Sequence, residues 1–216
     1  MSGAGVSVGF GGEIVIEDSL IRDNAGAGLD IILNPNVIVA RTTIDRNGTL
    51  GIDFMPSASA ASLSVTASHI VRNALIGIRV NPNNVPATFS LTHSTVARNV
   101  SNGVYMSSSN GSSPITAALS DNSIMQNSVG VTAFSAGGLG LVTGALSGNF
   151  ISAHGNTGVS TFNTGALLVL DRNTITHNFF GVSRATGSVI ETRSSNTVRE
   201  NGTDTLGDPF TAVGGV

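Results

Sequence analysis

The sequence predicts an all-β protein, a parallel β-helix in which about eight coils stack into a solenoid. Three observations lead to this fold class. One motif recurs along the whole chain at intervals of 23 to 28 residues. Each copy holds three short segments in which aliphatic and polar residues alternate, the pattern of a strand with one buried face. Apolar residues at helical spacing do not occur. We therefore expect three short parallel sheets around a shared aliphatic interior.

The strands of one copy can be followed in chain order. The first contains an alternating aliphatic or aromatic pair, such as Phe89 and Leu91. The second is centred on an aliphatic residue such as Val96, three residues before a recurrent asparagine. The third follows a glycine, as Val104 follows Gly103. Glycine is expected at this point because the corner requires either a positive φ or a close approach of two backbones.

The recurrent asparagine is expected to form an internal ladder at one corner of the solenoid. A side-chain amide carries both a donor and an acceptor, so asparagines in successive coils can bond one another and the turn backbone. The last but two of these positions is a histidine, which we expect to replace asparagine structurally. The eight ladder positions are Asn24, Asn47, Asn73, Asn99, Asn127, His154, Asn178 and Asn201. A column of Ser, Thr or Asn five residues earlier is expected to make similar local bonds.

Composition limits the classes of function. Aromatic residues make up only 5% of the 216 residues and Trp is absent, so the core must consist of Ile, Val, Leu and Ala. The net charge is −3 and all ten basic residues are Arg, which predicts no general affinity for nucleic acid. No apolar run is long enough to insert into a membrane, and the features of a signal peptide are missing. The chain has no Cys, which excludes disulfides and thiolate chemistry.

The pattern predicts a single β-helix domain over residues 1–216, with a C-terminal cap or tail at 202–216. At the N-terminal end, Gly5 and Val6 already repeat the glycine–aliphatic strand. We therefore expect a piece of a longer β-helix that is truncated at its N-terminal end. Exposed end coils would allow end-to-end self-association. Near the other end, Glu191 and Arg193 fall where inward aliphatic residues are expected.

Insertions concentrate between the third strand of one coil and the first strand of the next. The longest are 81–88, 107–116 and the glycine-rich 135–143. Loops on one side of a solenoid commonly form its binding face, so this corner is the best indication of a site.

An outward column next to these loops places Asp30 and Asp53 in neighbouring coils, flanked by Arg79 and Tyr105. Strands in neighbouring coils stack about 4.8 Å apart, so the two carboxylates should form a close pair. Such a pair could catalyse glycoside hydrolysis, contact a sugar, or hold Ca²⁺ through its oxygens. The alternative is a solvated ladder in which Arg79 offsets the repulsion between the carboxylates.

A second column lies immediately before the asparagine ladder. It contains three stacked arginines, of which Arg72 and Arg98 are candidates for binding uronate or sulfate groups bidentately. The alternative is a hydrated row that Asp23 and Asp45 partly balance. The column runs Asp23, Arg46, Arg72, Arg98 and Gln126.

The motif, seen in Ser94, Val96, Asn99 and Gly103, resembles the right-handed parallel β-helix repeat superfamily, with its pectate-lyase-like fold. That group includes pectate lyases, polygalacturonases and many uncharacterised exported bacterial repeat proteins. The resemblance covers essentially residues 5–201. It implies right-handed coils, a polysaccharide as ligand or substrate, and a location outside the cell or in the cell envelope. No catalytic signature of pectate lyases or polygalacturonases aligns here, and the chain has no Lys for a lyase base.

Three functions follow from these observations. The favoured one is a non-catalytic module that recognises extracellular or cell-surface polysaccharide through the loop corner. The second is a polysaccharide-degrading enzyme, a glycoside hydrolase or polyuronate lyase, that uses Asp30, Asp53 and Arg79. The third is a structural or assembly segment of a longer exported repeat protein. The sequence leaves open whether the protein is an enzyme, and Ca²⁺ is the only cofactor that the residues suggest.

Overall fold

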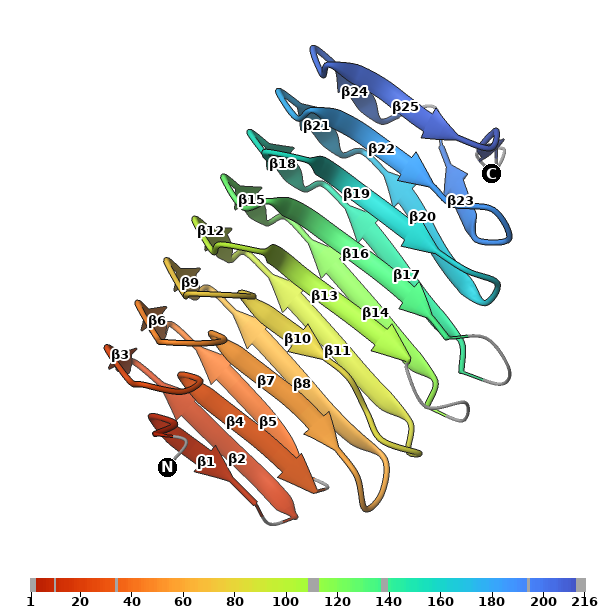
Figure 1. Cartoon of the computed structure of the whole chain (residues 1–216). Coiled ribbons are helices and arrows are strands. Elements are labelled where there is room, and N and C mark those ends of the chain that lie inside the picture. The colour runs from red at the N-terminus through yellow and green to blue at the C-terminus, as the bar shows by residue number, and fades with distance from the viewer. Residues whose placement is uncertain are drawn as a thin grey trace.

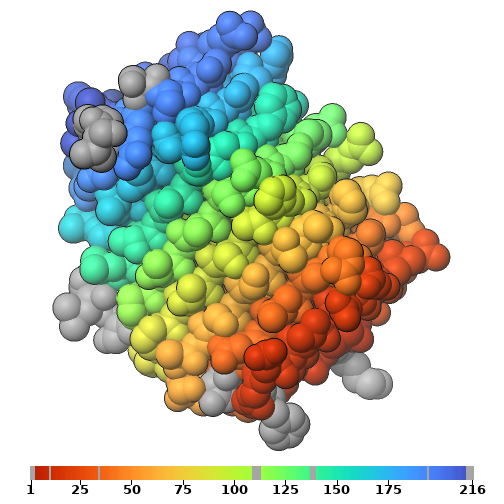
Figure 2. Space-filling model, turned by 180° about the vertical axis from the view of Figure 1, so that it is seen from behind, coloured from red at the N-terminus to blue at the C-terminus, as the bar shows by residue number. Residues whose placement is uncertain are grey.

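The computed structural model describes residues 3–9, 11–33, 35–108, 113–136, 140–193 and 195–212. All regular elements in these residues are β-strands, and every strand pairs in parallel with the strands three before and three after it. The coils stack in chain order, with the two ends of the chain at opposite ends of the stack (Figure 1). From behind, each coil crosses the surface as a band of one colour (Figure 2). The predicted all-β parallel solenoid is confirmed.

The strands form three sheets, which we call A, B and C. Sheet A contains nine strands: β1 (Val6–Val8), β4 (Leu29–Leu33), β7 (Ile52–Pro56), β10 (Ile78–Val80), β13 (Asn102–Ser108), β16 (Val129–Ser135), β19 (Thr157–Phe162), β22 (Phe180–Arg184) and β25 (Thr203–Gly207). Sheet B contains nine strands: β2 (Gly12–Glu17), β5 (Pro35–Ala40), β8 (Ala61–Thr66), β11 (Ala87–Thr92), β14 (Ile115–Ser120), β17 (Val142–Ser147), β20 (Ala166–Asp171), β23 (Val189–Thr192) and β26 (Thr211–Ala212). Sheet C contains eight strands: β3 (Leu20–Arg22), β6 (Thr43–Asp45), β9 (His69–Val71), β12 (Thr95–Ala97), β15 (Ser123–Met125), β18 (Phe150–Ser152), β21 (Thr174–Thr176) and β24 (Thr197–Arg199). The eight strands of sheet C are separated by seven coil-to-coil steps, so the solenoid makes about seven turns, slightly fewer than predicted.

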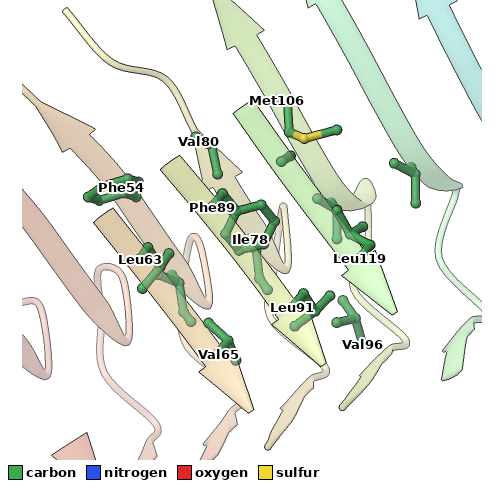
Figure 3. Packing of buried hydrophobic residues seen from close by; sticks show 14 of the residues in the cluster. Phe54, Leu63, Val65, Ile78, Val80, Phe89, Leu91, Val96, Met106 and Leu119 are labelled. Carbon is green, nitrogen blue, oxygen red and sulfur yellow. The ribbon is translucent and has the colours of Figure 1, made fainter. Parts of the chain in front are cut away.

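The core is one continuous aliphatic column enclosed by the three sheets. In the strands of the inner coils, alternate residues point inward and are buried, as in β8, where Ala61, Leu63 and Val65 alternate with half-buried Ser and Thr. Equivalent inward residues of successive coils pack on one another, so that Val65, Leu91 and Leu119 lie in register in adjacent strands of the interior (Figure 3). Full burial of one such side chain stabilises the fold by about 1.5–3 kcal/mol.

The asparagine ladder is confirmed. Asn47 Nδ2 donates to Asn73 Oδ1 at 2.9 Å, and Asn73 Nδ2 donates to Asn99 Oδ1 at 2.9 Å. The backbone N–H of each of these residues donates to the same oxygen of the next coil, so the bonds between ladder asparagines all point toward the C-terminal end. The second polar column forms a ladder too. In it, Asn122 donates to Asn149, at 2.9 Å, and Asn149 donates to Asn173, at 3.0 Å.

The residue before each ladder asparagine, and not the glycine, carries the unusual backbone conformation. Asp23, Arg46 and Arg72 have φ of 57°, 50° and 55°. A left-handed conformation costs a non-glycine residue about 1–2 kcal/mol, and the ladder bonds on either side hold the chain in it. Gly77 has no positive φ, but a Cβ there would lie 2.6 Å from the carbonyl oxygen of Gly103 in the next coil. Of the two reasons expected for glycine, close approach is the one that applies.

His154 takes the place of asparagine in the ladder, as expected. Its Nδ1 accepts from the backbone N–H of Asn127 at 3.2 Å, and its Nε2 lies 3.1 Å from the carbonyl oxygen of Ile124. A neutral imidazole with its hydrogen on Nε2 satisfies both bonds. The backbone N–H of His154 donates to Asn178 Oδ1 at 3.0 Å, so the ladder continues. Burial lowers the pKa of His154 to about 4.

The C-terminal coil differs from the expectation in its register. Ile190 and Thr192 pair with the inward residues of β20, and Ile190 is fully buried, while Glu191 points outward. The connection from Thr192 to Asn196 is one residue longer than the equivalent connection from Leu170 to Asn173, so the inward positions shift by one relative to the ladder. In the tail, β25 and β26 extend sheets A and B, and Phe210 packs against the core.

In the part of the chain that the structure describes, we find no helix with the length and apolar character needed to span a bilayer.

Candidate functional site

The predicted outward column is present on sheet A. The strand register aligns Asp30 with Asp53, Asp53 with Arg79, and Arg79 with Tyr105. The outward column continues through Thr132 to Ser160 and Ser183. These side chains point away from the core because each lies between two inward residues of its strand. The four residues predicted for this site are therefore brought together in four consecutive coils.

This outer face is recessed. Asp53, Thr132 and Ser160 point outward, yet they are only 5%, 4% and 2% exposed. Neighbouring side chains on the same face therefore project further outward and shield these three residues from solvent. Two hollows lie on this face, one on each side of Arg79, and we call them the N-terminal hollow and the C-terminal hollow.

The N-terminal hollow has a volume of about 330 Å³. Ile32 and Met55 follow Asp30 and Asp53 by two residues and so lie on the same side of the sheet. Arg79 Nη2 lies 3.2 Å from Met55 Sδ, which joins this hollow to the central column. Its lining comprises Ile32, Met55, Ser57, Asn81 and Asn83. The last two come from the first of the three predicted loops, whereas 109–112 and 137–139 of the other two lie outside the described residues.

The C-terminal hollow has a volume of about 360 Å³ and contains aromatic side chains beside hydroxyl and amide groups. Phe134 and Phe162 pair across neighbouring strands, and Phe162 is 40% exposed. Along the floor, Asn102 Nδ2 donates to Thr132 Oγ1 at 2.7 Å, and Thr132 Oγ1 lies 2.9 Å from Ser160 Oγ. The lining comprises Asn102, Tyr105, Val129, Thr132, Phe134, Asn156, Thr157, Ser160 and Phe162.

Sequence reasoning identified Tyr105 in this hollow but missed both phenylalanines. A signal for them exists in the sequence. Phe134 and Phe162 each follow a member of the outward column by two residues, so a strand places them on the same face. In a chain with only nine Phe and one Tyr, two aromatic residues in register on an outer face are informative.

The two carboxylates of the column have different environments. Arg79 binds Asp53 as a fork, with Nε 2.7 Å from Oδ1 and Nη2 2.6 Å from Oδ2. These hydrogen bonds raise the pKa of Arg79 further. The anticipated role of Arg79 as the residue that offsets the repulsion therefore applies to one carboxylate of the pair.

Asp30 has no comparable partner. Its Oδ1 is inaccessible to solvent and has no hydrogen-bond donor among the described residues. Burial raises the pKa of Asp30, the charge of Asp53 raises it further, and Arg79 opposes them. The predicted carboxylate pair thus consists of one ion-paired group and one unpaired group, whose ionised form is disfavoured.

We expect Asp30→Asn to raise the free energy of unfolding by about 1 kcal/mol, because it removes a partly buried charge and its repulsion by Asp53. Urea titration monitored by circular dichroism measures this change. Asp121→Asn is the matched control, because it removes one negative charge from the exposed corner between β14 and β15. A loss of stability in Asp30→Asn would mean that Asp30 has a stabilising partner.

The arginine column lies on another face, beside sheet C. Arg72 forms a fork with Asp45 at 2.8 Å for both contacts, and Arg46 pairs with Asp23 and Asp45. These acids balance the row, as the alternative interpretation anticipated. Arg98 donates to Gln126 Oε1 at 2.8 Å and has no carboxylate partner in the described part of the chain.

Arg72 and Arg98 border a separate hollow of about 260 Å³ on the outer face of sheet C. Arg79 and Tyr105 belong to sheet A. The six residues predicted to bind a substrate therefore fall into two groups on two faces.

The residues at the carboxylate pair do not fit Ca²⁺ well. A Ca²⁺ ion takes six to eight oxygen ligands, and both oxygens of Asp53 are engaged by Arg79. Among the residues that the structure describes, no group of three or more His, Cys, Asp or Glu is placed to hold a metal ion.

These features define a parallel β-helix solenoid with internal side-chain ladders, a structural module with a recessed outer face. The family described as the right-handed beta helix region matches residues 1–129, more than half of the chain, and the protein belongs to this family. Comparison with curated proteins and with solved structures gave no match. Membership establishes the right-handed fold, but this architecture supports many activities, so function must be argued from the site.

Proposed function

We propose that the protein is a non-catalytic module that binds an extracellular or cell-surface polysaccharide along the outer face of sheet A. The observation that carries this proposal is the C-terminal hollow, where Tyr105, Phe134 and Phe162 stand beside hydroxyl and amide groups. Aromatic side chains offer an apolar surface to the faces of sugar rings, while the polar groups match sugar hydroxyls. Aromatic residues make up only 5% of the sequence, so three of them in one hollow are informative.

The shape of the face suits a linear polymer. The column from Asp30 in β4 to Ser160 in β19 crosses six consecutive strands of sheet A. Six strands at about 4.8 Å spacing extend over roughly 24 Å. The C-terminal hollow lies on this line and the N-terminal hollow lies beside it. Each hollow lies at the lower end of the range usual for small-ligand sites, which is about 300–1,000 Å³. A chain of sugars lying along the solenoid axis would contact both hollows.

The state of Asp53 favours binding over catalysis. A glycoside hydrolase needs one carboxyl group as acid and a second carboxylate as nucleophile or base on either side of the scissile bond. Both oxygens of Asp53 are held by Arg79, and its side chain is only 8% exposed. Asp53 is therefore poorly placed to attack a substrate or activate water.

A glycoside hydrolase is the second candidate because of one observation. The pKa of Asp30 is raised by burial, and a general acid must retain its proton near the working pH. Incubation of the protein with any polysaccharide that it binds, followed by a reducing-sugar assay, distinguishes the two candidates. Release of reducing ends by the wild type, and its loss in Asp30→Asn, would establish the hydrolase and overturn the non-catalytic proposal.

A glycan array followed by titration calorimetry tests the proposed binding. We expect a double variant, Phe134→Ala with Phe162→Ala, to lose at least about tenfold in affinity, or about 1.4 kcal/mol, because it removes two adjacent aromatic surfaces. Phe150→Ala is the matched control, since Phe150 is 42% exposed but lies on the outer face of sheet C. Equal losses in the control, or no glycan bound by the wild type, would contradict the proposal.

A further inference from the structure

We propose that Asp30 makes the outer face of sheet A selective for polysaccharides that contain protonated amino sugars, and that this face rejects polyuronates. This inference rests on the proposed function, because it names the chemical class of the polysaccharide that the same face binds. It is carried by the distribution of charge along the column and by the unpaired carboxylate in it.

The charge of the face is unbalanced at one end. Between β4 and β19, sheet A has three charged residues, Asp30, Asp53 and Arg79. The fork between Arg79 and Asp53 neutralises two of them. One negative charge therefore remains, at Asp30, beside the N-terminal hollow.

Asp30 has no cationic partner on either side along the column. Its neighbour in the preceding coil is Ser7, and its neighbour in the following coil is Asp53. The carboxylate is half-buried, its Oδ1 has no donor, and its ionised form is disfavoured. A ligand ammonium group at the exposed side of this carboxylate would supply the positive charge that the neighbouring residues of the column do not provide. An ion pair in a partly desolvated position also contributes more than one in open water.

The same arrangement excludes acidic polymers. A uronate or sulfate beside Asp30 would add a second uncompensated negative charge. Arg79 is the only cation among the strands of the site, and its Nε and Nη2 are already directed at Asp53. Arg98, which has no carboxylate partner in the described residues, lies beside sheet C and cannot act on this face.

Neutral parts of the ligand have a separate place to bind. The C-terminal hollow begins at Tyr105, one coil beyond Arg79, and carries no charged residue in its lining. Sugars without an amine can therefore pack on Phe134 and Phe162 while an amine of the same chain reaches Asp30. Affinity thus depends on the aromatic end of the face and selectivity on the acidic end.

Titration calorimetry with three hexasaccharides tests this division. The probes are the N-acetylglucosamine hexamer, which is neutral, its fully de-N-acetylated form, which is cationic, and the galacturonic acid hexamer, which is anionic. For the wild type, at mildly acidic pH where the amines are protonated, we expect the cationic hexamer to bind at least about tenfold more tightly than the neutral one. The anionic hexamer should show no measurable binding.

Asp30→Asn should reduce the affinity for the cationic hexamer to the affinity that the same variant shows for the neutral one. Asp121→Asn, which lowers the overall negative charge by the same amount, should retain the full preference. Equal binding of the cationic and neutral hexamers by the wild type would overturn the role of Asp30. So would an unchanged preference in Asp30→Asn, an equal loss in Asp121→Asn, or tight binding of the anionic hexamer.

The outcomes also separate this inference from the proposed function. Binding of all three hexamers that depends on Phe134 and Phe162 but not on Asp30 would overturn the selectivity alone. A failure of the wild type to bind any glycan, here and on the array, would overturn the proposed function and this inference with it.

Discussion

Replacing Asn73 by alanine is expected to lower the free energy of unfolding by about 4 kcal/mol. Asn73 is fully buried, and its Oδ1 accepts from both the backbone N–H and the Nδ2 of Asn47. Its Nδ2 donates to Asn99 Oδ1 at 2.9 Å and to the carbonyl oxygen of Ile44 at 3.4 Å. Alanine leaves the backbone N–H of Asn47 without a partner and removes one bond each from Asn47 Nδ2, Asn99 Oδ1 and the carbonyl oxygen of Ile44. Each buried polar group left unsatisfied costs about 1–3 kcal/mol.

Urea unfolding and hydrogen exchange measure this effect together. Asn24→Ala is the matched control, because Asn24 is the first rung among the described residues, half-buried, and donates to Asn47 without accepting a ladder bond. We expect the control to lose about 1 kcal/mol or less. In Asn73→Ala, the backbone amide of Asn47 should also lose its protection from exchange. Similar losses of stability in the two variants would show that the contribution of a ladder bond to the free energy of unfolding does not depend on its burial.

Acidification is expected to destabilise the protein through His154 by up to about 3 kcal/mol, which follows from about 1.36 kcal/mol per pKa unit. Burial lowers the pKa of His154 from 6.5 to about 4. Between these values the unfolded chain binds a proton that the folded chain does not. The contribution of His154 to stability is therefore complete above pH 6.5 and is lost as the pH falls toward about 4.

Burial of the ring sets this direction, because the interior disfavours the protonated, charged form. Protonation places a hydrogen on Nδ1, which then faces the backbone N–H of Asn127 as a second donor. The groups that bond the ring are the backbones of Asn127 and Ile124, and neither can supply a compensating negative charge.

His154→Asn provides the comparison, because asparagine occupies the equivalent position in the coils on either side. We expect the variant and the wild type to differ by less than about 1 kcal/mol at neutral pH, and the variant to become the more stable protein in acid. Urea titrations at a series of pH values measure the difference, in which contributions from other groups cancel. A difference that is independent of pH would mean that His154 is not buried in its neutral form.

The ladders also explain why this chain tolerates a costly backbone conformation at so many corners. Arg72 and Arg98 adopt positive φ without being glycine, asparagine or aspartate. In each case the next residue is a ladder asparagine held by buried bonds to both neighbouring coils. The charged side chains at these corners point to solvent, where Asp45 pairs with Arg72 in the next coil.

Much of the site could be predicted by counting from the ladder. The alignment of Asp30, Asp53, Arg79 and Tyr105 follows from their constant distance to the glycine–aliphatic pair, and the strand register confirms it. The counting was wrong at Glu191, where one additional residue entered a corner and shifted the strand. Periodicity locates a residue only where the connecting corners keep their length.

The solenoid, its three sheets, the asparagine ladder and the column of the candidate site could all be predicted from the amino-acid sequence. These depend on spacing along the chain, because a strand alternates its side chains and each coil pairs with the next in register. Two features are visible only in the folded protein: Arg79 binds Asp53 and leaves Asp30 unpaired, and Phe134 and Phe162 border a recessed surface. Arg79 could reach more than one acid, and the depth of a surface depends on the side chains that rise around it. Both are set by packing between coils, which spacing along the chain does not specify.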